Sequence, residues 1–273
     1  MKQFILKNAP DRDNIVRLEN NDYRYLVRVR RLAVGEYFNA VLPDGKETLV
    51  QILSIDRGAL NGKCTDLDTS LSPCEETKES LPPIILYQAL PKGDKMDLIV
   101  RQAAEGGITE VVPFVSEFST ARRAAAGGGQ KFSRWERIIK EARQQSGSKT
   151  ATSIRRPLTN KNELFQHWKQ VTGSGGALGL LFHHCQIAHK GLEQKSLHSY
   201  LNNIPQIIAM AVGPEGGFSN SEVSLFLENG FKPITIGDAV LRTETAALYF
   251  AAAIKILLLE RDSWELKQAK NNA

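Results

Sequence analysis

Hydrophobic and polar residues alternate over short stretches near the start of the chain. Across residues 24–30, three apolar side chains alternate with three arginines and a leucine, which is the pattern of a half-buried β-strand. Turn-forming residues follow at 34–36 and 43–45, the second between apolar-rich runs. We therefore expect residues 1–72 to form a small β-barrel built from short strands and tight turns.

The expected strand over residues 24–30 has a row of arginines on one outer edge: Arg24, Arg28 and Arg30. Such a row can contact the phosphates of a nucleic acid. It is equally typical of an edge strand that is charged to prevent pairing with another chain. Both interpretations stay open at the level of sequence.

The pattern changes after a polar, proline-bracketed stretch that we interpret as a linker at residues 73–82. Apolar runs then alternate with segments of helical character, and the runs lack polar alternation, as strands buried on both faces of a parallel sheet do. We expect strands at 83–90, 110–114, 177–183, 207–212 and 234–236, and helices at 94–106, 133–147, 219–230 and 243–260. Residues 83–260 are thus predicted to form an α/β domain, with a polar tail at 261–273.

Local signals mark the ends of several of these helices. Asp94 precedes the first helix, and Ser133 and Ser219 each begin a Ser-x-x-Glu capping box. Gly230 is placed to end the helix that begins after Ser219. The helix from Thr243 is apolar on all sides through residue 254, so it must be buried in the core or against another subunit.

Charge is concentrated in one segment. The chain has 273 residues and a formal net charge of +5, but residues 117–157 alone carry ten basic and three acidic side chains. A local excess of this kind is typical of a surface that binds a polyanion, although a solvated helix and loop can also carry it.

Cysteines and apolar runs exclude several other classes of protein. Cys64, Cys74 and Cys185 show no C-x-x-C spacing, so neither a disulfide framework nor a zinc site is indicated. The apolar stretch at residues 4–6 is too short for a signal peptide, and the longest apolar run, at 246–254, cannot span a bilayer. We expect a reduced, cytoplasmic location, no membrane association and no metal.

Two loops follow the last strands of the predicted sheet, where α/β proteins bind ligands. Residues 212–219 contain three glycines and a proline, and residues 236–246 place polar side chains at the start of a helix. Either loop alone is consistent with a well-capped turn, but together they indicate a small-molecule site. No phosphate-binding loop is present, and the glycines at 173–179 precede a strand instead of following one, so a nucleotide-dependent enzyme is disfavoured.

The same segments resemble a known family. VGPEGGFSNSE followed by IGDAVLRTETAALYF is similar to the last two knot loops of the RsmE-type methyltransferases, which belong to the SPOUT (trefoil-knot) superfamily. LPKGDKMDLIVRQAAEGGITEVVPFVSE and SRWERIIKEARQQSG resemble the earlier part of that domain, and VRVRRLAVGE resembles the signature of its N-terminal PUA-like barrel. The resemblance implies a PUA-like barrel followed by a SPOUT domain with a deep trefoil knot.

The resemblance also implies an activity. It points to an enzyme that uses S-adenosyl-L-methionine to methylate N3 of uridine 1498 in 16S ribosomal RNA, acts on the small ribosomal subunit and forms a homodimer. The residues that it assigns to the cofactor are Leu181, Phe182, Gly213, Glu215, Gly216, Gly217, Ile236, Gly237, Leu241, Arg242, Thr243, Glu244 and Thr245.

Catalysis and RNA binding can be assigned on chemical grounds. Uracil N3 carries a proton that must leave, and charge develops on the uracil oxygens. We expect Arg242 to steady that charge and Glu244, or Glu215 in its place, to take the proton, although Glu244 could equally serve only as a helix cap. The residues expected to bind RNA are Arg24, Arg28, Arg30, Arg122, Arg123 and Lys149.

Three positions depart from the family's pattern. Phe118 and Ser148 stand where arginines are expected, and the triplet at 183–185 replaces residues that are usually acidic or proline. The first two could shift RNA contacts to Lys149, Arg122 and Arg123. Two alternatives therefore remain: a non-catalytic RNA-binding ribosome-assembly factor, and a SPOUT methyltransferase with a different RNA target.

Overall fold

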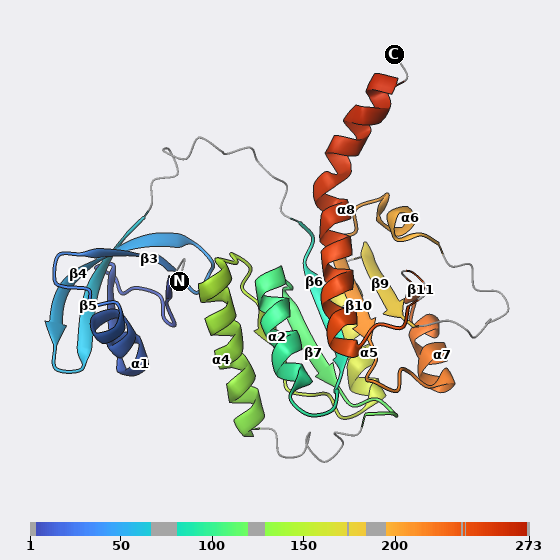
Figure 1. Cartoon of the computed structure of the whole chain (residues 1–273), viewed down its shortest axis with the longest axis horizontal. Coiled ribbons are helices and arrows are strands. Elements are labelled where there is room, and N and C mark those ends of the chain that lie inside the picture. The colour runs from blue at the N-terminus through green and yellow to red at the C-terminus, as the bar shows by residue number, and fades with distance from the viewer. Residues whose placement is uncertain are drawn as a thin grey trace. The chain divides into compact units, whose positions relative to one another are not determined.

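The computed structural model describes residues 4–66, 81–119, 129–173, 175–183, 195–235, 237 and 239–271. The chain divides into two compact units (Figure 1). The first comprises residues 1–78 and 140–151, and the second comprises residues 79–139 and 152–273. Most of the expected linker at 73–82 lies outside the described residues, so the domain boundaries stay a prediction.

The first unit is a curled, five-stranded sheet. Its strand order is β1 (Phe4–Ile5), β3 (Tyr37–Val41), β4 (Glu47–Asp56), β5 (Ala59–Asp66) and β2 (Ile15–Glu19). Only the β1–β3 pair is parallel among the described pairings. Alternate side chains point inward, so Phe38, Val50 and Ile52 are buried in one small core. The β-rich unit expected from the sequence is confirmed, as a half-barrel.

The strand expected at residues 24–30 is wrong. Helix α1 (Asn20–Tyr23) leads directly into a π-helix, η1 (Arg24–Val29). Leu26, which the alternation placed on the arginine face, is fully buried in the core of the sheet, whereas Val29 is 68% exposed. Tertiary packing of Leu26 therefore overrides a short alternating pattern, which is a weak signal over seven residues.

The second unit contains a six-stranded sheet in which all strands are parallel. Its strand order is β11 (Lys232–Ile234), β9 (Ala177–Phe182), β10 (Ile207–Val212), β6 (Ile84–Ala89), β7 (Glu110–Phe114) and β8 (Ser153–Ile154). Every residue of β6 is buried. The expected parallel α/β domain is confirmed, and the carboxyl ends of its strands meet at one edge of the sheet.

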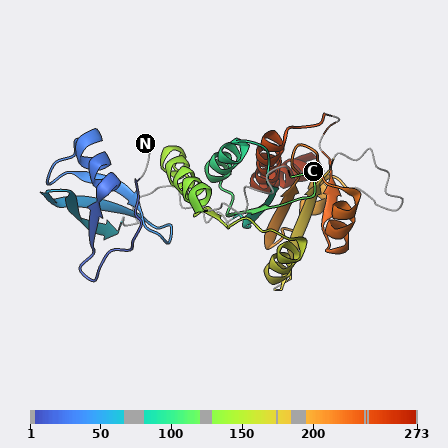
Figure 2. The same cartoon turned by 90° about the horizontal axis from the view of Figure 1, so that it is seen from below.

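Helices cover both faces of this sheet (Figure 2). Helices α2 (Lys95–Gly106) and α8 (Thr243–Asn271) pack on one face, and α5 (Lys161–Thr172) and α7 (Asn220–Glu228) pack on the other. The remaining helices are α4 (Gly129–Ser146) and α6 (Leu197–Leu201). Rings from Tyr87, Trp168, Phe226 and Phe231 form the core beneath α5 and α7.

Two of the three helix starts expected from local signals are confirmed. Ser219 forms a complete capping box with Glu222, and α2 begins directly after Asp94, although the Asp94 side chain makes no cap hydrogen bond. Ser133 does not begin a helix, because α4 already starts at Gly129 and the residues between favour helix.

The last elements differ from expectation in their limits. Strand β11 covers Lys232–Ile234 instead of residues 234–236, and Gly237 beyond it has a φ of 70°. Helix α8 continues past residue 260 to Asn271. Within the described part of the chain, none of the helices is both long and apolar enough to cross a membrane. The trefoil knot stays a prediction.

Candidate functional site

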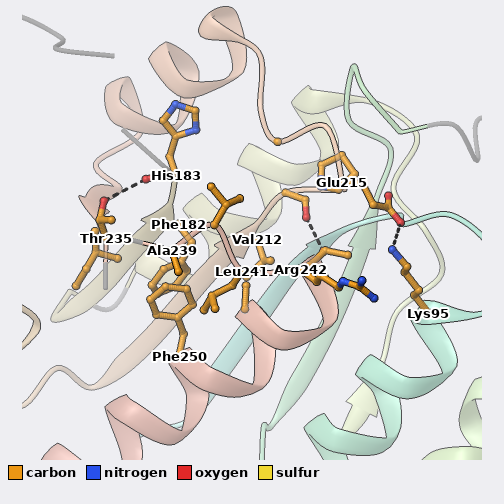
Figure 3. Close-up of a pocket in the computed structure, with 17 residues that line it drawn as sticks. Lys95, Phe182, His183, Val212, Glu215, Thr235, Ala239, Leu241, Arg242 and Phe250 are labelled. Atoms are coloured by element: carbon orange, nitrogen blue, oxygen red, sulfur yellow. Dashed lines mark hydrogen bonds and ion pairs between the residues drawn. The ribbon is translucent and has the colours of Figure 1, made fainter. Parts of the chain in front are cut away.

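A cavity of about 370 Å³ lies at the carboxyl ends of β9, β10 and β11 (Figure 3). Its volume is within the range of small-molecule sites. The residues that line it are Lys95, Phe182, His183, Val212, Gly213, Pro214, Glu215, Gly217, Ile234, Thr235, Ala239, Val240, Leu241, Arg242, Thr243, Ala246 and Phe250. The two glycine- and threonine-containing loops thus meet around one cavity.

One part of the cavity is apolar. The rings of Phe182, at the end of β9, and Phe250, on α8, pack against each other there. Ala246 and Phe250 follow Thr243 on the same face of α8, at the i, i+3 and i+7 positions of a helix. This wall is suited to the flat or apolar part of a ligand.

The first loop requires glycine at two positions for different reasons. At Gly213, a Cβ would lie 3.2 Å from the backbone of Gly217. At Gly217 itself the space is open, but φ is +71°, which side chains rarely adopt. A hydrogen bond from Gly217 N to Pro214 O closes the turn at 2.9 Å. The backbone of this loop can therefore approach a ligand closely.

Hydrogen bonds join the second loop to the first. The Thr243 hydroxyl, at the start of α8, donates to Gly213 O at 2.6 Å. The same hydroxyl accepts a hydrogen bond from Gln88 Nε2, on β6, at 2.9 Å. On the opposite side of the cavity, Thr235 donates to His183 O at 3.2 Å. The site is thus built from residues far apart in the sequence.

Charged residues lie together at one side of the cavity (Figure 3). Lys95 Nζ is 2.7 Å from Glu215 Oε1 and 3.7 Å from Glu244 Oε2. The backbone N–H of Lys92 also donates to both Glu215 oxygens, at 3.1 and 3.3 Å. Glu215 therefore bridges the loop after β6 and the loop after β10, with Arg242 nearby.

These contacts shift two pKa values in opposite directions. Burial alone would raise the pKa of the Glu215 carboxyl, but hydrogen bonds from Lys95 and the backbone outweigh it and hold the pKa below its ordinary value. The hydrogen bond to Glu215 raises the pKa of Lys95. Both groups are charged at neutral pH, so Glu215 is a poor proton acceptor.

The structure brings about half of the expected cofactor residues into the cavity wall: Phe182, Gly213, Glu215, Gly217, Leu241, Arg242 and Thr243. The others lie around it. Leu181 points into the core beneath α5 and α7, because neighbouring residues of a strand face opposite sides. Gly216 packs against Phe118, and Glu244 contacts Lys95. Gly237 lies in the second loop and Thr245 is exposed on α8, while Ile236 lies outside the described residues.

The expected RNA-binding residues of the first unit are accessible. Arg24, Arg28 and Arg30 are exposed at η1 and its end. Lys149 forms an exposed ion pair with Glu47 at 3.3 Å. Arg122 and Arg123 lie outside the described residues, as do His184, Cys185 and His189 of the polar stretch after β9.

Sequence reasoning missed several residues of the site. Lys95 follows the end of β6, and the rule that ligands bind beyond the carboxyl ends of parallel strands could have indicated it. Phe250 could have been found from its helical spacing to Thr243. Gln88 carried no signal, because its importance depends on which residues the fold places beside it.

Known proteins share both the sequence and the fold. The family model of an RNA methyltransferase domain matches residues 77–255, and that of an RNA methyltransferase PUA domain matches residues 18–63. Ribosomal RNA small subunit methyltransferase E of Synechocystis sp. is 32% identical over 245 residues, which cover 89% of this chain and 73% of the relative.

Two solved structures resemble the chain over nearly its whole length. Ribosomal RNA small subunit methyltransferase E from Neisseria gonorrhoeae, bound to S-adenosyl methionine, has a TM-score of 0.73 at 24% identity and covers 94% of this chain and 98% of its own. A methyltransferase from Legionella pneumophila, solved with bound cofactor, has a TM-score of 0.71 at 26% identity and covers 93% and 97%.

The fold is thus the SPOUT-like α/β arrangement preceded by a PUA half-barrel that the sequence led us to expect. Nearly two thirds of the chain match one family model, and the Synechocystis relative, of which the match covers 73%, is 32% identical. The chain therefore belongs to the RsmE family of RNA methyltransferases that carry a PUA domain.

Proposed function

We propose that this protein uses S-adenosyl-L-methionine to methylate N3 of uridine 1498 in 16S ribosomal RNA. The observation that carries this proposal is the cavity at the ends of β9, β10 and β11, around which both family loops meet. Relatives are named as methyltransferases of small-subunit ribosomal RNA, which supports this class of substrate. The Legionella structure was solved with S-adenosylmethionine bound, which supports this cofactor.

The residues present fit this cofactor. Gly217 leaves open space beside the backbone of the first loop, and Phe182 and Phe250 offer an apolar surface for a planar ring. Leu241 and other residues of the loop before α8 also line the cavity. When bound, the cofactor supplies an electrophilic methyl group on a sulfonium sulfur.

Glu244 is the residue that we assign to accept the N3 proton. Its buried Oε2 atom lies 3.7 Å from Lys95 Nζ and has no hydrogen-bond partner within the described part of the chain, and its side chain is 14% exposed. Glu215 is less suited, because its carboxylate already accepts three hydrogen bonds. As Glu244 takes the proton, the electron pair of N3 becomes free to form the new N–C bond. With the cofactor bound, its methyl–sulfur bond would break in the same step and leave the electron pair on sulfur.

Arg242 is the residue that we assign to the uracil oxygens. It lines the cavity, its side chain is exposed, and Figure 3 shows it on the same side as Lys95 and Glu215. A guanidinium can donate to a carbonyl oxygen on which negative charge develops. The pairing edge of uracil is accessible only in an unpaired or flipped nucleotide, so the RNA must be irregular at this point.

The exposed arginines of the first unit support RNA binding. Arg24 and Arg28 belong to the π-helix η1, and Arg30 follows it. Contacts between such side chains and phosphates release counterions, so they strengthen binding without selecting a sequence. We propose that this surface and the basic segment at 117–157 together hold the ribosomal substrate.

The exposed apolar residues of helix α8 are evidence for a homodimer. Its face away from the sheet exposes Tyr249, Ile256 and Leu259 by 50%, 52% and 57%. Together with Thr245 and Ala252, these residues repeat at alternating intervals of four and three, which is the spacing of a seam between packed helices. A contiguous apolar stripe of this kind is typical of an interface, so we propose that two copies pair through it.

The test of this function has two parts. Titration calorimetry should detect binding of S-adenosylmethionine or its homocysteine product to the purified protein. A strain that lacks the protein should lose one 3-methyluridine from its 16S RNA, and the purified protein should restore it on small subunits. Absence of binding, an intact N3-methyl group in the deletion strain, or a methyl group on a ribose oxygen would overturn the assignment.

A further inference from the structure

We infer that Gln88 is a positioning residue that sets the spacing between the two cofactor loops. It lies near the end of β6 and is fully buried, with no exposed surface. It does not line the cavity, so it acts through Thr243 and Gly213, which do. The inference rests on the proposed function, because it deepens the account of the same site.

Register places Gln88 beside the first loop. In the sheet, Gln88 pairs with Val212, the last residue of β10, and Gly213 follows directly. From there the Gln88 side chain reaches Thr243, the first residue of α8, at 2.9 Å. The Gln88 amide therefore lies between β10, which leads into the first loop, and α8, which follows the second loop.

The directions of these hydrogen bonds are fixed. Gly213 O can only accept, so the Thr243 hydroxyl must give its single proton to it, over 2.6 Å. The hydroxyl oxygen must then accept from Gln88, and only the amide nitrogen can donate. Gln88 Nε2 also donates to Ala89 O at 3.0 Å, which uses both of its protons. The amide has one orientation, and a carboxylate could not replace it.

The other end of the Gln88 amide is unsatisfied. Its Oε1 atom is buried, and no group among the residues that the structure describes forms a hydrogen bond with it. A buried acceptor without a partner destabilises the folded state, and an apolar side chain of similar size would avoid that cost. A residue needed only for packing would therefore be expected to be leucine or methionine, so the role of Gln88 is tied to its two donated bonds.

Three variants separate positioning from packing. Gln88→Met keeps the volume but removes the donor, and Thr243→Val removes the hydroxyl while Thr243→Ser keeps it. We expect Gln88→Met and Thr243→Val each to weaken binding of S-adenosylmethionine, measured by calorimetry, by about tenfold, the equivalent of one buried hydrogen bond. The double variant should be no weaker than the weaker single variant, because both remove the same link. Thr243→Ser, which keeps the hydroxyl, should lose less affinity than Thr243→Val.

Melting temperatures distinguish a positioning role of Gln88 from a packing role. Gln88→Met removes two donated hydrogen bonds together with an unsatisfied acceptor, and these effects on stability offset each other, so its melting temperature should stay close to that of the wild type while its affinity falls. Gln102→Met is the matched control. Gln102 lies on α2, does not line the cavity, and has a buried Oε1 that likewise forms no hydrogen bond with the described residues. It should leave cofactor affinity unchanged.

Each other outcome contradicts the inference. Gln88→Met that binds the cofactor like the wild type shows that the link does not position the loops. A loss of affinity with a matching fall in melting temperature shows a packing role. Wild-type protein that fails to bind S-adenosylmethionine overturns the proposed function, and this inference with it. If the wild type binds the cofactor and Gln88→Met binds it equally well, only the inference is overturned.

Discussion

Replacement of Gly217 by valine tests the first loop most directly. The structure leaves open space around a Cβ at this position, so no steric clash is expected. The cost arises from the backbone, because φ is +71° and a β-branched residue strongly disfavours that region. A strained residue of this kind costs about 1–3 kcal/mol, which lowers the melting temperature by about 2–4 °C per kcal/mol in a domain of this size.

Gly58→Val is the matched control for this substitution. Gly58 lies in the turn between β4 and β5, has a φ of +92° and also has open space around its Cβ. Both variants should therefore be destabilised to a similar extent in a thermal unfolding assay, each in its own unit.

Cofactor binding should separate the two variants. If Gly217→Val relieves its strain by changing φ, the loop moves and calorimetry should show loss of S-adenosylmethionine binding, whereas Gly58→Val should bind like the wild type. Gly217→Asn should retain more affinity than valine, because asparagine tolerates positive φ better. Full affinity in Gly217→Val, or equal losses in both valine variants, would refute the reasoning.

Four further variants test the charged and exposed residues. Glu244→Gln should lower kcat on ribosomal subunits by about 100-fold, the lower range for a lost proton acceptor, with little change in cofactor Kd; an unchanged kcat would leave Glu244 as a helix cap. Glu215→Gln should reduce stability at neutral pH, because the folded pKa of Glu215 lies below its unfolded value. The stability that the Glu215 carboxylate contributes is lost as pH falls through the folded pKa, so the melting temperatures of variant and wild type should converge in acid. A difference in melting temperature that stays constant with pH would contradict this expectation. Ile256→Lys should convert a dimer to monomers in light scattering, and an unchanged mass would place the interface elsewhere. Replacing Arg24 and Arg28 by alanine should flatten the dependence of RNA affinity on salt by about one unit per lost contact, and an unchanged slope would exclude this surface.

The sequence alone determined the class of fold and the place of the site. The apolar runs that became β6 and β10 lack polar alternation, which is a direct consequence of burial on both faces of a sheet. The capping box at Ser219 was read correctly because its two hydrogen bonds join residues three apart. Glycines after β10 indicated a ligand loop, because the ability of glycine to adopt a positive φ is a property of the residue itself.

Short patterns failed where distant contacts decide. The alternation at residues 24–30 predicted a strand, but the burial of Leu26 in the core of the half-barrel stabilises a π-helix there instead. The Ser133 capping box was equally misleading, because a helix that starts upstream needs no cap at that point.

Only the tertiary structure decided which side chains of the site contact one another. Lys95 and Glu215 form their ion pair across 120 positions of sequence, and Gln88 reaches Thr243 across 155. Strand alternation, and not residue type, directs Phe182 into the cavity and Leu181 into the core. The order of the strands brings these residues together, and that order depends on the packing of the whole sheet, which no local pattern of side chains encodes.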